Sequence, residues 1–191
     1  MRTSFKFLAF TFDDIEPLAS FLQDRFARPK MSVVIQAGGE SKRMGVPKET
    51  VSFLGKPMIC HVIERVSSLA DELIVTTNNP DRLQFLKKTY PTIQLVPDRL
   101  KTRGSISGLY TALLCAHHDL VSVVACDMLD FPVALLAQEA LLLRPCAYPN
   151  LAVVLPKSEH GIEPFAGVYR KEPCLSKLEQ FISEKGSNAS L

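Results

Sequence analysis

The stretch VVIQAGGESKRMGVPKE, residues 33–49, indicates both the fold class and the kind of ligand that this chain is expected to bind. Val33 to Gln36 is typical of a short buried strand, and a small-residue turn follows it directly. Three cations, Lys42, Arg43 and Lys48, come soon after the turn. Glycine lets the backbone approach a ligand closely and exposes main-chain amides that can bind an anion. The stretch therefore predicts a strand that leads into a phosphate-binding loop.

The full motif is more specific than its glycines. Both common phosphate-binding fingerprints, G-x-x-x-x-G-K-[ST] and G-x-G-x-x-G, are absent, which disfavours P-loop hydrolysis and nicotinamide chemistry. A simple strand-to-helix turn with solvated cations is the alternative, and the letters AGG alone would favour it. The complete pattern A-G-G-x-S-x-R-M-G, with Lys48 three residues later, favours a bound triphosphate.

Outward from this stretch, apolar runs of strand length alternate with segments of helical periodicity. This alternation predicts an α/β domain with a mainly parallel central sheet covered by helices on both faces. In the helix expected at 104–117, five apolar side chains are predicted to face inward: Ile106, Leu109, Tyr110, Leu113 and Leu114. The expected strands are 33–36, 72–76, 93–96, 121–125, 151–155 and 165–169, and the expected helices are 57–69, 81–90, 104–117, 132–143 and 174–184.

Residues 1–30 differ from the rest and are interpreted as an N-terminal extension. An amphipathic helix is predicted there after Asp13 or Asp14, because apolar residues recur at three- and four-residue spacing from Ile15 to Phe26. Residues 28–30 then read as a linker. The domain is expected to span 31–191.

Composition limits the classes of partner and compartment. A chain of 191 residues suits one domain, and a net charge of +2 gives no indication of a nucleic acid or a membrane surface as partner. The five cysteines are scattered and include no C-x-x-C pair, so neither a disulfide framework nor a zinc site is expected. No signal peptide and no membrane span is recognised, and we expect a cytoplasmic protein.

In a parallel sheet, ligands bind beyond the carboxyl ends of the strands, so the residues that follow each strand are the candidates. The first strand delivers Gln36-Ala37-Gly38-Gly39. Asn78 follows the second strand and Asp98 the third. Either can be an ordinary turn residue, but Asn78 can contact a base or ribose. The Asp98 carboxylate can accept hydrogen bonds from a pair of N–H groups such as guanine presents.

Asp127 follows the hydrophobic strand predicted at 121–125. A helix N-cap or a turn is the alternative role for this residue. A carboxylate at the end of a central parallel strand lies close to the predicted loop, however, and oxygen ligands suit Mg²⁺ bound together with substrate phosphates. The sequence therefore favours Asp127 as a magnesium ligand. No Ser-His-Asp or Cys-His arrangement can be singled out, so covalent catalysis is not expected.

Together these motifs resemble the molybdenum cofactor guanylyltransferases, within the wider group of nucleotidyltransferases with a Rossmann-like fold. The resemblance covers about residues 31–185. Gly39, where several related proteins carry alanine, points to this branch. The quoted motifs are residues 37–48, Gly104 to Gly108 before a helix, Cys126-Asp127-Met128, and EPFAGVYR at 163–170.

The resemblance implies a single Rossmann-like three-layer domain that transfers GMP from GTP to molybdopterin cofactor and releases pyrophosphate. It implies that Gln36, Ala37, Gly38 and Gly39 hold the nucleotide. Lys48 would contact the phosphates, Asn78 and Asp98 the nucleoside, and Asp127 a Mg²⁺ ion. Arg43 would join Lys48 in offsetting negative charge during the reaction. Protein partners in cofactor delivery are a further implication.

Two departures from the family pattern concern the site: Gln36 replaces a more usual leucine, and Gly-Ser-Ile-Ser-Gly at 104–108 replaces Gly-Pro-Leu-Ala-Gly. The family also usually continues beyond the point where this sequence stops. The open alternatives are transfer from CTP, transfer to a sugar phosphate or an alcohol, and a GTP-binding module without turnover.

Overall fold

The protein is described here from a computed structural model, which covers residues 28–38, 47–100, 104–144, 148–159 and 161–188. Its centre is a six-stranded sheet in the order β5-β4-β1-β6-β10-β7. The helix predicted before residue 28, together with Gly39 and Arg43, lies outside the described residues. The sheet strands are β1 Met31–Gln36, β4 Glu72–Thr76, β5 Gln94–Val96, β6 Leu120–Ala125, β7 Val153–Val154 and β10 Ala166–Arg170.

The sheet is mainly parallel, as predicted. Strands β5, β4, β1 and β6 pair in parallel, while β10 runs antiparallel to both β6 and β7. The register places Gln36 between Thr76 and Ala125, so β1, β4 and β6 end at the same edge. That edge, called the carboxyl edge below, is where the loops that follow these strands meet.

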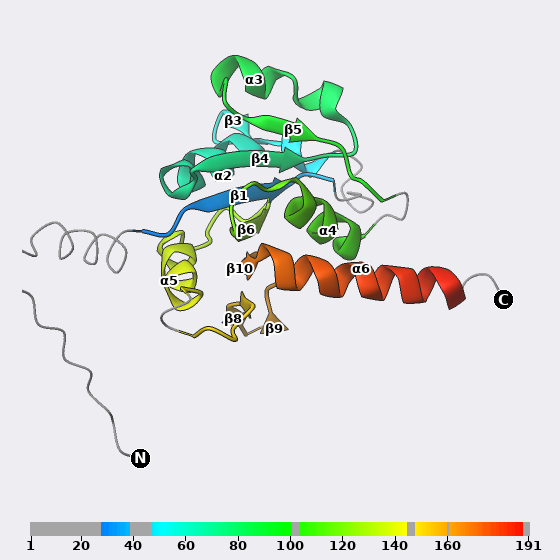
Figure 1. Ribbon diagram of the computed structural model, residues 1–191. Coiled ribbons are helices and arrows are strands. Elements are labelled where there is room, and N and C mark those ends of the chain that lie inside the picture. The colour runs from blue at the N-terminus through cyan, green and yellow to red at the C-terminus, as the bar shows by residue number, and fades with distance from the viewer. Residues whose placement is uncertain (1–27, 39–46, 101–103, 145–147, 160, 189–191) are drawn as a thin grey trace, which may run out of the picture.

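Helices cover both faces of the sheet and make the domain a three-layer α/β structure (Figure 1). One buried cluster joins the sheet to α2, α3 and α5, and the other joins it to α4 and α6, which pack against each other. The helices are α2 Met58–Val66, α3 Phe85–Thr89, α4 Ser105–Cys115, α5 Ala134–Leu142 and α6 Lys171–Asn188, with 3-10 helices η2 Lys48–Thr50, η3 Ser67–Leu69 and η4 Pro80–Leu83.

The sequence prediction was wrong in three details. The helix predicted at 81–90 is divided into η4 and α3, and the strand predicted at 151–155 pairs only at Val153–Val154. In α4, Ile106 and Leu114 are 39% and 38% exposed rather than inward. The two short hairpins, β2 Ser52–Phe53 with β3 Lys56–Pro57 and β8 Lys157–Ser158 with β9 Gly161–Ile162, were not predicted.

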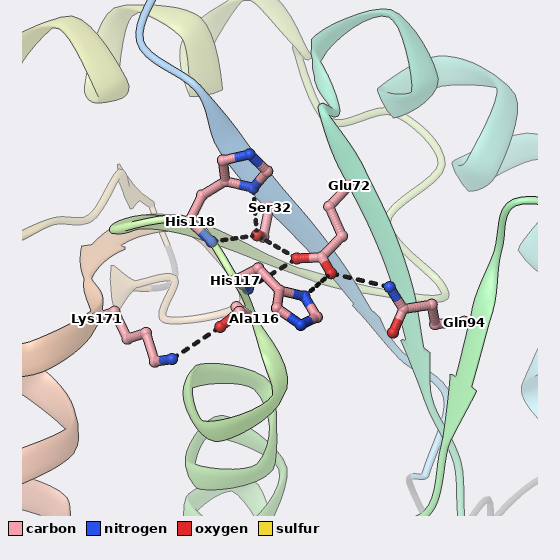
Figure 2. A network of polar contacts seen from close by, with 7 residues as sticks. All are labelled: Ser32, Glu72, Gln94, Ala116, His117, His118 and Lys171. Carbon is pink, nitrogen blue, oxygen red and sulfur yellow. Dashed lines mark hydrogen bonds and ion pairs between the residues drawn. The ribbon is translucent and has the colours of Figure 1, made fainter.

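A polar network lies at the opposite, amino edge of the sheet (Figure 2). The Glu72 carboxylate accepts hydrogen bonds from the Ser32 hydroxyl at 2.6 Å, from Gln94 Nε2 at 2.9 Å, and from the backbone amide and the ring of His117. Since the Ser32 proton points to Glu72, Ser32 Oγ accepts from the His118 amide at 3.2 Å and from its Nδ1 at 3.0 Å. The network therefore links β1, β4 and β5 to the segment that leaves α4.

No helix within the described ranges is long and apolar enough to span a bilayer. Cys60, Cys115, Cys126 and Cys174 are free thiols. Burial raises the pKa of Cys126 to about 12, with a further contribution from the neighbouring Asp127 carboxylate. Cys126 is therefore a neutral packing residue near neutral pH.

Candidate active site

Lys48 and Asp127 meet at the carboxyl edge although they are far apart in the sequence. Lys48 Nζ donates a hydrogen bond to Asp127 Oδ2 at 2.7 Å. The lysine begins η2, and the aspartate follows β6. Both side chains are partly open to solvent, with 43% and 37% of their surface exposed. An exposed ion pair contributes only about 0–1 kcal/mol, so a polyanionic ligand can separate the two groups at little cost.

The position of Asp127 follows from the end of the sheet. The Cys126 amide donates to the Gln36 carbonyl at 3.1 Å, which continues the β1–β6 pairing one residue beyond β6. A turn follows, in which the Met128 amide bonds to the Ala125 carbonyl at 3.2 Å. Asp127 is therefore fixed at the point where the chain leaves the sheet.

Gly38, Asn78 and Asp98 form a second group on the same edge. Asn78 Nδ2 donates to the Gly38 carbonyl at 2.8 Å. A Cβ atom on Gly38 would lie 3.1 Å from Asp98 Oδ2 and 3.2 Å from Asn78 Nδ2, tighter than ordinary van der Waals contact. These side chains therefore lie close against the backbone at Gly38, and a side chain there would press on both of them.

Asp98 carries an unsatisfied acceptor. Its Oδ1 atom is buried and has no hydrogen-bond partner among the described residues. Burial raises the pKa of Asp98 above its ordinary value, and a hydrogen bond from Asn78 offsets part of this increase. A buried carboxylate oxygen without a donor is costly, and a ligand with N–H groups would relieve that cost.

Gln36 and Ser107 add two further unsatisfied polar atoms on the α4 face of the sheet. Gln36 Nε2 and Ser107 Oγ are buried and lack partners within the described residues. The Gln36 amide packs against α4 so closely that a Cβ on Gly108 would lie 2.6 Å from its Oε1 atom. The sequence did not single out Ser107 as a polar group of the site, because a serine in the first turns of a helix gives no signal of burial.

Gly104 precedes α4 with a φ of +140°, a conformation that favours glycine. It allows the chain to enter α4 directly after the segment that follows Asp98, and the Arg99 amide bonds to Thr111 Oγ1 of α4 at 2.9 Å. Asp98 and the first turns of α4 therefore belong to one packed unit.

The residues fit a metal ion that arrives with a substrate rather than one held by protein alone. Across the described part of the chain, no group of three or more His, Cys, Asp or Glu side chains is arranged to bind a metal. Mg²⁺ in phosphate-transfer sites is commonly bound by one or two carboxylates together with substrate oxygens. The exposed Asp127 carboxylate can supply one such ligand.

The structure thus brings the sequence-predicted residues together in two neighbouring sets. Lys48 with Asp127 forms one, and Gly38 with Asn78 and Asp98 forms the other. Ala37 directly precedes Gly38 in the chain, and its amide bonds to the Thr76 carbonyl at 2.8 Å. Gly39 and Arg43 lie outside the described residues, so their predicted roles stay predictions.

Residues 33–191 match the family model of the MobA-like NTP transferase domain. The chain belongs to the MobA-like NTP transferase family. A probable molybdenum cofactor guanylyltransferase of Nostoc sp. is 30% identical over 156 residues, which cover 82% of this chain and 73% of that protein. The molybdenum cofactor guanylyltransferase of Syntrophotalea carbinolica is 30% identical over 152 residues, which cover 79% of this chain and 68% of that protein.

A solved structure agrees with this membership. The molybdopterin-guanine dinucleotide biosynthesis protein A of Archaeoglobus fulgidus superposes with a TM-score of 0.64 at 25% identity, over 81% of this chain and 74% of its own. The Rossmann-like fold expected from the motifs is therefore confirmed by this MobA-like relative.

Proposed function

We propose that this MobA-like protein transfers GMP from GTP to molybdopterin cofactor and releases pyrophosphate. The observation that carries the proposal is the meeting of Lys48 and Asp127 beside the Gly38–Asn78–Asp98 group. The first pair suits the phosphates and the second group suits the nucleoside. The names of the family relatives support the same reaction.

The reaction requires positioning and charge stabilisation rather than a covalent intermediate. A phosphate oxygen of the acceptor attacks the α-phosphorus of GTP, a new P–O bond forms, and the bond to the β-phosphate oxygen breaks. Negative charge grows on the departing pyrophosphate. Lys48 offsets this charge as a compact cation once it leaves Asp127, and Arg43 is proposed to assist with its planar guanidinium group.

Asp127 is proposed to hold Mg²⁺ that is bound with the nucleotide. The ion would neutralise and orient phosphate oxygens when present. The Lys48–Asp127 pair then serves the resting protein, because each charge keeps the other in place until nucleotide and metal arrive. Its exposure makes the exchange of partners inexpensive.

Asp98 is proposed to select guanine. Its unpartnered Oδ1 and its Oδ2 can together accept from the adjacent ring N–H and amino group of guanine. Cytosine presents only one amino donor on the corresponding edge. Gly38 and Ala37 would let the base and ribose lie against the backbone, while Asn78 holds the Gly38 carbonyl in position.

The test is pyrophosphate release by the purified full-length chain with GTP or CTP, each with and without purified molybdopterin cofactor and Mg²⁺. We expect release only when GTP, cofactor and Mg²⁺ are all present. Release of pyrophosphate with CTP would instead indicate that the protein transfers CMP. Binding of GTP without any release would instead support a nucleotide-binding module that lacks turnover.

A further inference from the structure

A pocket of about 550 Å³ opens beside Asp127. One wall is the segment from Asp127 to Pro132 with Leu135 of α5, and the other is β8 with Pro156, Glu163 and Ala166. Sites for small molecules usually have volumes of roughly 300–1,000 Å³ and mostly apolar walls with few polar groups. This pocket fits the volume criterion, and its largely apolar walls also carry Asp130, Lys157, Ser158 and Glu163 beside Asp127.

The pocket begins at the proposed reaction centre. Asp127 lines it and also holds Lys48 at 2.7 Å, so a molecule in the pocket lies next to the place proposed for the triphosphate. The nucleoside contacts proposed for Gly38, Asn78 and Asp98 do not line this pocket. The pocket therefore lies on the side of Asp127 that faces away from the proposed nucleoside contacts.

The walls suit a flat ring system. Met128, Phe131, Pro132 and Pro156 contribute apolar surface from two separate segments of the chain. Aromatic, thioether and proline side chains on facing walls pack well against a planar heterocycle. A sugar or a simple alcohol would instead need many hydrogen-bonding groups along both walls.

Glu163 is the polar group that can identify the ring system. Ser158 Oγ donates to its Oε1 at 2.7 Å, which fixes the carboxylate at the hairpin. The Glu163 amide bonds to the Pro156 carbonyl at 3.0 Å, and its own carbonyl accepts from Ala166 at 3.2 Å. A carboxylate has about four lone-pair sites, so Glu163 can accept from a ligand as well as from Ser158.

We propose that this pocket binds the fused heterocycle of the acceptor and that Glu163 is a specificity residue for it. The carboxylate would accept hydrogen bonds from a ring N–H and an adjacent amino group, the donor pair that a pterin presents. The phosphate of the acceptor would then extend toward Asp127 and Lys48. This inference rests on the proposed function, because it assigns a place to the second substrate of that reaction.

The variant Glu163→Gln tests the assignment. It preserves the size of the side chain and its ability to accept from Ser158, but one carboxylate oxygen becomes an amide donor that opposes the N–H groups of the ring. Glu179→Gln is the matched control, since it makes the same substitution at an exposed carboxylate of α6 that does not line the pocket. Thermal unfolding of both variants checks that the hairpin still folds.

Loss of a charge-assisted hydrogen bond should raise the KM for molybdopterin cofactor about tenfold or more in Glu163→Gln, while the KM for GTP stays unchanged. Glu179→Gln should change the cofactor KM by no more than about threefold. An unchanged cofactor KM in Glu163→Gln, or equal losses in both folded variants, would overturn the assignment.

A second readout separates this proposal from the proposed function. Binding of 6-hydroxymethylpterin, followed by its own fluorescence, needs neither GTP nor turnover. We expect the wild-type chain to bind this probe and Glu163→Gln to bind it about tenfold more weakly. Absence of binding to the wild type would overturn the pocket assignment even if pyrophosphate release succeeds. Binding without pyrophosphate release would retain the pocket and reject the transferase.

Discussion

At the scale of single residues, Lys48 and Asp127 separate the roles of charge in catalysis and in stability. Their ion pair is exposed, so replacing either residue by an uncharged one should lower the free energy of unfolding by no more than about 1 kcal/mol. In the transition state the same charges would act on phosphate oxygens, where one lost contact typically costs about 3 kcal/mol. The two effects should therefore differ in size.

We predict that Lys48→Ala and Asp127→Asn each reduce kcat/KM about a hundredfold while the variants remain folded. The measurement is steady-state pyrophosphate release beside urea denaturation. Lys56→Ala is the control, because it removes another exposed ion pair, with Glu64, away from the site. Retention of normal turnover in either site variant would contradict the assigned roles.

Asp98 supports a prediction about both base choice and pH. Asp98→Asn keeps the shape but replaces one acceptor by a donor, so GTP affinity should fall about tenfold or more and the preference over CTP should narrow. Burial raises the pKa of the wild-type carboxyl, so the acceptor form is lost at a higher pH than for an ordinary aspartate. GTP binding should therefore weaken on acidification, beginning at a higher pH than an ordinary aspartate would give.

Calorimetric titration of GTP and CTP at a series of pH values below neutrality checks the Asp98 prediction, since protonation of the carboxylate removes the acceptor. If Asp98→Asn bound GTP as tightly as the wild type and with the same pH profile, guanine recognition would have to lie elsewhere.

At the scale of elements, the junction of β7 with β10 depends on Gly167. A Cβ on this residue would lie 2.8 Å from the Val154 carbonyl oxygen and 2.4 Å from Leu155 Cδ2. The leucine side chain can rotate, but the carbonyl belongs to the strand that pairs with β10 at Val168. Relief of the clash therefore requires movement of the sheet edge itself.

We predict that Gly167→Ala lowers the free energy of unfolding by about 1–3 kcal/mol, the usual cost of overpacking. Urea denaturation measures the loss. The double variant Leu155→Ala with Gly167→Ala distinguishes the two obstacles, because it removes the side-chain clash and leaves the backbone one. The added alanine should remain destabilising in the Leu155→Ala background. If Gly167→Ala left the free energy of unfolding unchanged in the Leu155→Ala background, the Val154 carbonyl would be no obstacle.

The strands that carry the site were predictable because each combines a clear apolar run with a turn residue at its carboxyl end. Val33 to Gln36 and 121–125 are of this kind, and the parallel sheet then places Asp127 near Lys48. The division of the helix at 81–90 and the β8–β9 hairpin were not predictable. Hairpins of two-residue strands carry no periodicity, and Glu163 gains its position only from that hairpin and Ser158.

The face that α4 turns toward the sheet could not be predicted from the sequence either. Ile106 and Leu114 read as inward residues by hydrophobicity, yet α4 buries the small residues Ser107, Gly108 and Ala112 against the sheet. Close packing of a helix on a strand end favours small side chains, and Gln36 occupies the space that remains. The polar recess at Gln36 and Ser107 therefore follows from tertiary packing, which a single sequence does not report.

At the scale of the whole molecule, the two edges of the sheet divide the work between function and stability. The carboxyl edge holds three of the five unsatisfied buried polar atoms of the described residues, at Gln36, Asp98 and Ser107, and the other two belong to Ser122 of β6 and Glu139 of α5. The Glu72 carboxylate at the amino edge is instead fully engaged (Figure 2). A buried polar group without a partner lowers the stability of the fold unless a ligand bonds to it. A buried network whose members are all hydrogen-bonded instead fixes the arrangement of the elements. The amino edge is therefore expected to stabilise the fold against the cost of the site.

Glu72 provides the test of this division. Its side chain is only 9% exposed. Burial alone would raise its pKa, but the hydrogen bonds from Ser32 and from the backbone and ring of His117 outweigh burial and hold the pKa below its ordinary value of 4.5. The unfolded chain therefore binds a proton on this residue more readily than the folded chain. The stability that Glu72 contributes is present above about pH 4.5 and is lost as the pH falls through the lowered pKa of the folded state.

We predict that Glu72→Gln lowers the free energy of unfolding by about 1–3 kcal/mol near neutral pH, because it leaves donors of the network without a charged acceptor. The difference from the wild type should shrink as the pH is lowered, since the wild-type carboxylate is then protonated as well. Urea denaturation of both proteins across the acidic range measures this difference. The Asp71 carboxyl, whose pKa is also lowered, is present in both chains and cancels in the comparison. A difference independent of pH would mean that Glu72 acts through shape alone, and GTP binding at the distant carboxyl edge should be unchanged in either case.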